Sequence, residues 1–123
     1  MTRILVVETE VRARHALRSI LEGAGYDVDV AAGPLEAGRM FADNPAELVI
    51  TDAIDAQARL CFAGARMLAV PGGCAGREHE VAERVQAMGM SHFLPKPFRR
   101  DDLLDAVRFT LDMTPPKHDA HPN

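Results

Sequence analysis

The sequence predicts an α/β fold of three layers, in which a parallel five-stranded sheet is covered by helices on both faces. The first observation is that short apolar runs alternate five times with segments of helical period. The second is that these runs are aliphatic and β-branched without strict alternation, which is typical of strands buried on both sides. Because repeated strand–helix units connect parallel strands, the pattern favours a doubly wound parallel sheet.

Five apolar runs are the candidate strands. In chain order they are ILVV (4–7), VDVAA (28–32), LVI (48–50), MLAV (67–70) and HFL (92–94). In sheets of this kind, ligands bind beyond the carboxyl ends of the strands. The residues that directly follow each run are therefore the candidates for a functional site.

The first two helices are indicated by apolar spacing and by their end signals. In RARHALRSILEGAG, apolar residues recur every three to four positions; Thr9 is the expected N-cap, and Gly23 and Gly25 provide the stop. The second helix is expected to begin at Gly33–Pro34, with proline in its first turn, and to end at Asn44–Pro45.

The remaining helices differ in length. The stretch 53–70 has to hold a helix, a strand and two loops, so the third helix is expected to have only about two turns, within 56–62. Asp101 and Asp102 lie at the expected N-terminus of the fifth helix, where acids are favoured. The apolar stripes of the last two helices are Val81, Val85 and Met88, and then Leu103, Leu104, Val107 and Leu111.

Composition and charge narrow the class of protein. At 123 residues the chain is long enough for one domain with one core, which we expect over 1–113, followed by a disordered tail over 114–123. A net charge of −4 gives no electrostatic basis for binding nucleic acid or an anionic membrane. Cys61 and Cys74 are too few for a disulfide framework, and neither a signal peptide nor a membrane span is evident. We therefore expect a cytoplasmic protein.

Charged residues follow three of the candidate strands. Glu8 comes after the first run, Asp52 after the third and Lys96 after the fifth. Taken singly, such residues are more often polar strand ends that meet water. Together, at one edge of a parallel sheet, they are candidates for a common site.

The segments ILVVE, LVITD and FLPKPF resemble the receiver domain of bacterial response regulators, and the resemblance covers about residues 2–113. The stretches GAGYDVDVAAGPLEA and FLPKPFRRDDLLDAV are especially similar to the family pattern. The resemblance implies a flavodoxin-like (CheY-like) strand order 2-1-3-4-5. It also implies that Asp52 accepts a phosphoryl group from a histidine kinase or phosphotransferase, that Lys96 neutralises its charge, and that the Lys96–Pro97 bond is cis.

The resemblance further implies a Mg²⁺ site formed by Glu8, Asp52 and the backbone carbonyl of Ile54, with Glu10 as an alternative ligand. The family normally has two adjacent acids after the first strand, and here Thr9 replaces the second. A unit-charge pair at about 4 Å is worth ~4 kcal/mol at an effective dielectric of ~20. A divalent ion is attracted about twice as strongly as a unit charge. If ~2 kcal/mol of that attraction remains after desolvation, the loss of one acid lowers the affinity for Mg²⁺ roughly 30-fold. We therefore expect Mg²⁺ to bind weakly or not at all.

The family's switch residues are also altered. Pro71 replaces a threonine or serine whose hydroxyl binds the phosphoryl group, and Phe93 matches the aromatic switch position. Proline offers neither a hydroxyl nor a backbone N–H, so the usual coupling between the two positions cannot operate.

Two functions remain open at this point. The first is a non-enzymatic single-domain response regulator. Its face of fourth helix, fifth strand and fifth helix would bind a downstream protein target, and the same face is the candidate for a homodimer. The alternative is a phosphorylation-independent pseudo-receiver that acts as a constitutive protein-binding module. A flavodoxin-like cofactor protein is disfavoured, because no Ser/Thr- or Gly-rich phosphate loop follows the first strand.

Overall fold

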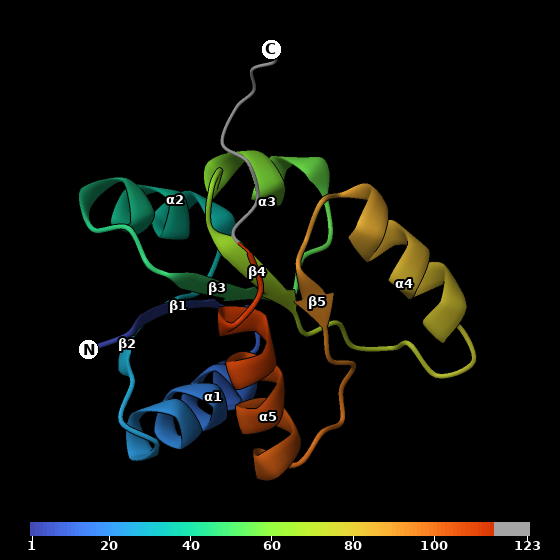
Figure 1. Ribbon diagram of the computed structural model, residues 1–123, viewed down its shortest axis with the longest axis horizontal. Helices are drawn as coiled ribbons and strands as arrows, with labels where there is room; N and C mark the ends of the chain where they lie inside the picture. The colour runs from blue at the N-terminus through green and yellow to red at the C-terminus, as the bar shows by residue number, and fades with distance from the viewer. Residues whose placement is uncertain (115–123) are drawn as a thin grey trace.

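The computed structural model describes residues 1–114, so the predicted tail lies outside the described residues except for Thr114. Strands and helices alternate along the described chain (Figure 1). The strands are β1 (Arg3–Val7), β2 (Asp27–Ala31), β3 (Leu48–Thr51), β4 (Arg66–Ala69) and β5 (His92–Phe93). The helices are α1 (Val11–Gly23), α2 (Pro34–Asp43), α3 (Ala56–Cys61), α4 (Glu78–Ala87) and α5 (Arg100–Leu111).

The strands form one parallel sheet in the order β2-β1-β3-β4-β5, which confirms the expected topology. Val7, the last residue of β1, is in register with Ala31 of β2 and Thr51 of β3. The carboxyl ends of these central strands therefore lie at one edge of the sheet. The residues that follow them, Glu8 and Asp52, are brought to that same edge.

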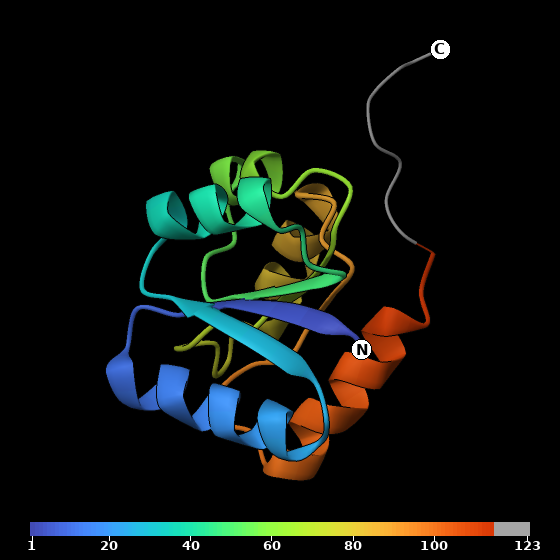
Figure 2. The same cartoon turned by 90° about the vertical axis from the view of Figure 1, so that its left-hand side faces the viewer.

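Helices cover both faces of the sheet, as Figure 2 shows, with α1 and α5 on one face and α2, α3 and α4 on the other. Alternate residues of β1 enter two separate cores. Ile4 and Val6 pack in the core that contains residues of α1 and α5, whereas Leu5 and Val7 pack in the other. This two-sided burial is the reason that the strand reads as a continuous apolar run. No described helix combines the length and the apolar character needed to cross a membrane.

Most helix ends agree with the sequence signals, and one does not. Pro34 occupies the first turn of α2, which ends before Asn44. The third helix has only six residues, as the short segment predicted. The N-cap of α1 was predicted wrongly: it is Glu10, whose side chain accepts a hydrogen bond from the Ala13 N–H at 2.7 Å, and not Thr9.

Candidate functional site

The candidate site lies at the carboxyl edge of the sheet, where the ends of β1, β3, β4 and β5 meet. Lys96 Nζ lies 2.6 Å from Glu8 Oε1, and Thr9 Oγ1 lies 2.8 Å from Asp52 Oδ2. The backbone N–H of Lys96 donates to the carbonyl of Pro71 at 2.9 Å. The structure therefore brings together side chains that the sequence places up to 88 residues apart.

Glu8 and Lys96 form a direct ion pair, called here the inner pair. Glu8 is only 1% exposed, whereas the Lys96 side chain is 27% exposed. The second carboxylate oxygen of Glu8 accepts the Glu10 N–H at 3.1 Å, and Arg14 donates to the Glu8 carbonyl at 3.0 Å. A buried carboxylate is tolerated only when it is paired and hydrogen-bonded. The ammonium group of Lys96 supplies the positive charge that the buried Glu8 carboxylate needs, and it therefore points to Glu8.

Asp52 has different surroundings from Glu8. It is half-buried, and its Oδ2 accepts two hydrogen bonds from Thr9, one from the hydroxyl at 2.8 Å and one from the backbone N–H at 3.2 Å. These two donors fix the orientation of the carboxylate. Among residues 1–114, Oδ1 has no hydrogen-bond donor and is the oxygen left for other chemistry.

Asp52 opens into a cavity of about 240 Å³, called here the outer pocket. Gly72 and Gly73 form part of its wall, and Gly73 has φ of +70°, a left-handed conformation that favours glycine in this turn. Two guanidinium-bearing side chains of the α4 region, Arg77 and Arg84, also line it. Asp55 lines it as well, so the outer pocket places two acids and two cations around one open space.

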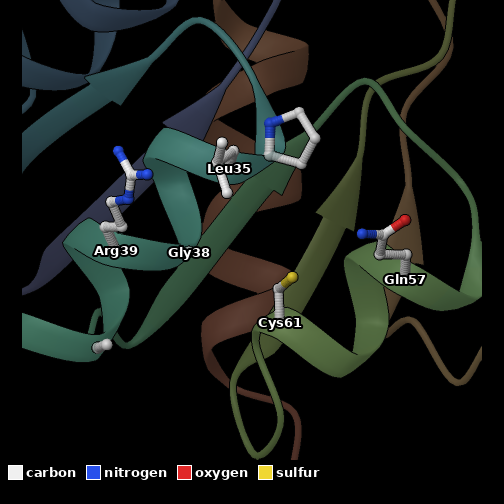
Figure 3. Close-up of a pocket in the computed structure, with 7 residues that line it drawn as sticks. Leu35, Gly38, Arg39, Gln57 and Cys61 are labelled. Atoms are coloured by element: carbon white, nitrogen blue, oxygen red, sulfur yellow. The ribbon is translucent and has the colours of Figure 1, made fainter.

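A second cavity, of about 370 Å³, lies between α2 and α3 and has a different character. Figure 3 shows Leu35 and Arg39 on α2 and Gln57 and Cys61 on α3 around it. Its lining is largely apolar and includes no acid. Because phosphoryl chemistry needs polar and charged groups, the outer pocket is the better candidate site.

The acids at the sheet edge do not fit Mg²⁺ as they are arranged here. Glu8 is held by Lys96, and the carboxylate of Asp55 caps α3 by accepting the Ala58 N–H at 2.8 Å. Glu10 caps α1, and the hydrogen bond from the Ala13 N–H lowers the pKa of its carboxyl. Within the described part of the chain, no three Asp, Glu, His or Cys side chains are grouped to hold a metal ion.

Several details of the predicted switch region can be placed. Pro71 is buried beside the outer pocket, and Ile54 lines the same pocket. Phe93 is half-buried against the core under α2, α3 and α4. The Lys96–Pro97 bond is cis, as the resemblance implied. Pro71 thus leaves the pocket without a hydroxyl at this position.

Three contributors to the site were missed by the sequence reasoning. Thr9 was interpreted as an N-cap and as the replacement of an acid, and the hydrogen bond from its hydroxyl to Asp52 was not predicted. Arg77 and Arg84 carried a usable signal, because a spacing of seven residues is about two helical turns and places both on one face. Which way that face points depends on the loop before α4, and the sequence pattern does not specify it.

Comparison with known proteins places these features in context. No protein-family model matches the chain. The chain is 34% identical over 127 aligned residues to the response regulator MprA of Mycobacterium avium, and 33% identical to that of Mycobacterium tuberculosis. Each alignment covers 96% of this chain and 54% of the relative, so the chain spans about half the length of these curated relatives.

Solved structures give a consistent result. A putative response regulator from Chloroflexus aurantiacus superposes with a TM-score of 0.80 at 21% identity, covering 91% of this chain and 98% of that one. A CheY-like receiver domain protein from Methanospirillum hungatei superposes with a TM-score of 0.74 at 25% identity, covering 91% and 94% of the two chains. The shared arrangement is the five-stranded parallel fold described above.

Proposed function

The chain is a receiver domain of the response-regulator family, and from that premise we propose that it signals in a phosphorelay by accepting a phosphoryl group on Asp52. Receiver domains in general are signalling modules that interact with histidine kinases or phosphotransferases. For this chain, a histidine kinase or phosphotransferase would be the donor. The domain responsible would be the packed unit of residues 1–113.

The proposed reaction needs a free carboxylate oxygen at an open strand end. Asp52 Oδ1 attacks the phosphorus atom of a histidine phosphoramidate or an acyl phosphate, and a P–O bond forms. The P–N or P–O bond to the donor breaks, and the leaving group keeps the bonding electron pair. Thr9 holds the other oxygen, Oδ2, so that the attacking oxygen is presented in one orientation.

The observation that carries this proposal is the contrast in access between two acids. Glu8 is buried and paired with Lys96, whereas Asp52 lines an open polar pocket. Of these two acids at the ends of the central strands, Asp52 is the one that a phosphoryl donor can reach. The coincidence of that access with the family's acceptor position supports Asp52 as the phosphoacceptor.

A contact face for the downstream target follows from the same proposal. Phosphorylation adds about −1.5 to −2 charges at one point. The surface of α4, β5 and α5 would read that change, and it is also the candidate for a homodimer. On it, the ring of Phe109 is 57% exposed and lies 4.9 Å from the His92 ring. The exposed ring of Phe109, beside the half-buried His92, suits a protein partner.

The experiment is phosphorylation with acetyl phosphate and Mg²⁺, followed by intact-mass measurement. The wild type and Asp55→Ala, the matched control at a neighbouring acid, are expected to gain one phosphoryl group. Asp52→Ala is expected to gain none. An unchanged wild-type mass at millimolar Mg²⁺, or a full gain in Asp52→Ala, would overturn the proposal.

A second candidate is the phosphorylation-independent pseudo-receiver. Two observations favour it: Lys96 is directed to Glu8 at 2.6 Å, and Pro71 provides no hydroxyl. Under this function the α4–β5–α5 face binds its target constitutively. Target binding would then be equal for the wild type and for Asp52→Ala, with and without a phosphoryl donor.

A further inference from the structure

Phosphorylation of Asp52 raises a charge problem that the usual groups do not solve in this chain. The phosphoryl group brings about −1.5 to −2 charges to a strand end. The acids present do not fit Mg²⁺, and Lys96, the one lysine among residues 1–114, is bound to the buried Glu8. Moving Lys96 away would leave a buried carboxylate unpaired, which is strongly unfavourable. Other cations are therefore needed at the pocket.

Two arginines are placed to supply this charge. Arg77 is the N-cap residue of α4, and Arg84 lies in its last turn. Both line the outer pocket together with Asp52, and Val81 lies between them on the same face of the helix. Guanidinium groups bind phosphate oxygens in a two-pronged geometry and keep their charge at any physiological pH.

Neither arginine is held firmly by another group. Arg77 contacts Glu80 at 3.2 Å, but both side chains are largely exposed, so that pair contributes little. Within the described residues, the side chain of Arg84 forms no salt bridge and no hydrogen bond. Both guanidinium groups are therefore available to an anion that enters the pocket.

The pocket has room for such an anion. Its volume is about 240 Å³, whereas a water molecule occupies about 30 Å³ of liquid. Gly72 and Gly73 keep one wall free of side chains. A phosphoryl group and several waters therefore fit between Asp52 and α4.

We propose that Arg77 and Arg84 form the anion-binding part of the site and neutralise the phosphoryl group at Asp52 in place of a divalent cation. This rests on the proposed function, because it names the groups that make the same transfer work. The transfer is balanced as described above: Asp52 Oδ1 forms the new P–O bond, and an acyl phosphate or phosphoramidate donor leaves with its electron pair. Phosphorylation then proceeds without metal.

The first test is the initial rate of phosphoryl incorporation from acetyl phosphate in EDTA. The wild type is expected to react at a rate within about threefold of that in Mg²⁺. Loss of one charge-assisted contact slows the reaction about tenfold. Arg77→Gln and Arg84→Gln should each show that decrease, and the double variant a decrease of about 100-fold. Arg100→Gln, an exposed arginine on α5, is the matched control and should react like the wild type.

A second measurement does not depend on transfer. Orthophosphate is titrated into the ¹⁵N-labelled Asp52→Asn variant while the arginine Nε–H resonances are followed. The resonances of Arg77 and Arg84 should shift and saturate, whereas that of Arg100 should not. In Arg77→Gln the shift of Arg84 should weaken, and in Arg84→Gln that of Arg77; both variants should unfold thermally like the wild type because the side chains are on the surface.

The outcomes separate the two proposals. Absence of labelling both with and without Mg²⁺ overturns Asp52 as acceptor, and the orthophosphate titration then decides the anion site by itself. Labelling that strictly requires Mg²⁺, or a double variant that reacts at the wild-type rate in EDTA, overturns the arginine proposal and leaves Asp52 in place. Absence of any orthophosphate shift at Arg77 and Arg84 also overturns it.

Discussion

Two carboxylates at the ends of neighbouring strands, Glu8 after β1 and Asp52 after β3, have opposite environments. Glu8 is buried, and the ammonium group of Lys96 neutralises it; this inner pair closes one half of the site. Asp52 is half-buried, receives hydrogen bonds from Thr9 and opens into the outer pocket. Solvent access and bonding partners, more than the type of residue, therefore separate an acid that stabilises the fold from one available for chemistry.

Breaking the inner pair should have the largest effect, and that effect should be on stability. Lys96→Met leaves the Glu8 carboxylate buried without a cation, which should lower the free energy of unfolding by about 3 kcal/mol. This is the lower end for a buried pair, because Lys96 is partly exposed. Urea denaturation measures the change.

The control for this prediction is the double variant Glu8→Gln/Lys96→Met, which removes both charges. It should recover most of the lost stability, because no uncompensated charge remains. If Lys96→Met has the same free energy of unfolding as the wild type, the buried Glu8 carboxylate does not depend on Lys96 for its charge.

The next effect is on the affinity for Mg²⁺. It tests whether the missing second acid after β1 prevents Glu8 and Asp52 from binding one metal ion together. Thr9→Asp restores a second carboxylate beside Glu8, and Mg²⁺ affinity should rise roughly 30-fold, the estimate of ~2 kcal/mol for one added ligand charge. Isothermal titration calorimetry gives the affinity. Thr9→Asn, of the same size without the charge, should bind Mg²⁺ like the wild type; an equal gain in both variants would contradict the electrostatic explanation.

A smaller effect is expected from the hydrogen bond that orients Asp52. Thr9→Val keeps the shape of the side chain but removes the hydroxyl donor, so phosphoryl incorporation should slow about fivefold, the equivalent of about 1 kcal/mol. Thr9→Ser retains the hydroxyl and should react at nearly the wild-type rate. If the serine variant is as slow as the valine variant, packing of the methyl group is responsible, not the hydrogen bond.

The smallest effect concerns His92, a half-buried ring that, unlike Glu8, forms no ion pair within residues 1–114. Burial lowers the pKa of His92 from its ordinary value of 6.5, so the folded protein favours the neutral ring. The stability contributed by the neutral His92 ring is therefore complete above the pKa that the ring has in the unfolded protein. It is lost as the pH falls through 6.5 toward the lower pKa of the folded protein. Denaturation curves across this range should show a flatter pH dependence for His92→Gln. His79→Gln, at an exposed position of α4, should keep the wild-type slope.

Much of the architecture could be predicted from the sequence, because it depends on local patterns. Apolar runs identified the strands, and the short segment between Asp52 and Pro71 predicted a short third helix. The exceptions depend on tertiary contacts. Thr9 fits an N-cap, but its hydroxyl is used by Asp52, 43 residues away, and Glu10 caps α1 instead.

The candidate site was harder to predict than the fold for the same reason. The resemblance located Glu8, Asp52 and Lys96, but which acid receives the lysine depends on side-chain geometry at the sheet edge. The structure assigns it to Glu8. The placement of Arg77 and Arg84 at the outer pocket depends on the turn before α4, where Gly76 has φ of +78°.

The contrast between Glu8 and Asp52 is tested most directly by finding which carboxylate carries the phosphoryl group. After incubation with acetyl phosphate, reduction with borohydride converts a phosphorylated aspartate to homoserine, and peptide mass spectrometry identifies the position. We expect homoserine at position 52 and unmodified Glu8 and Asp55. Modification at Glu8 or Asp55, or no modification at position 52, would contradict it.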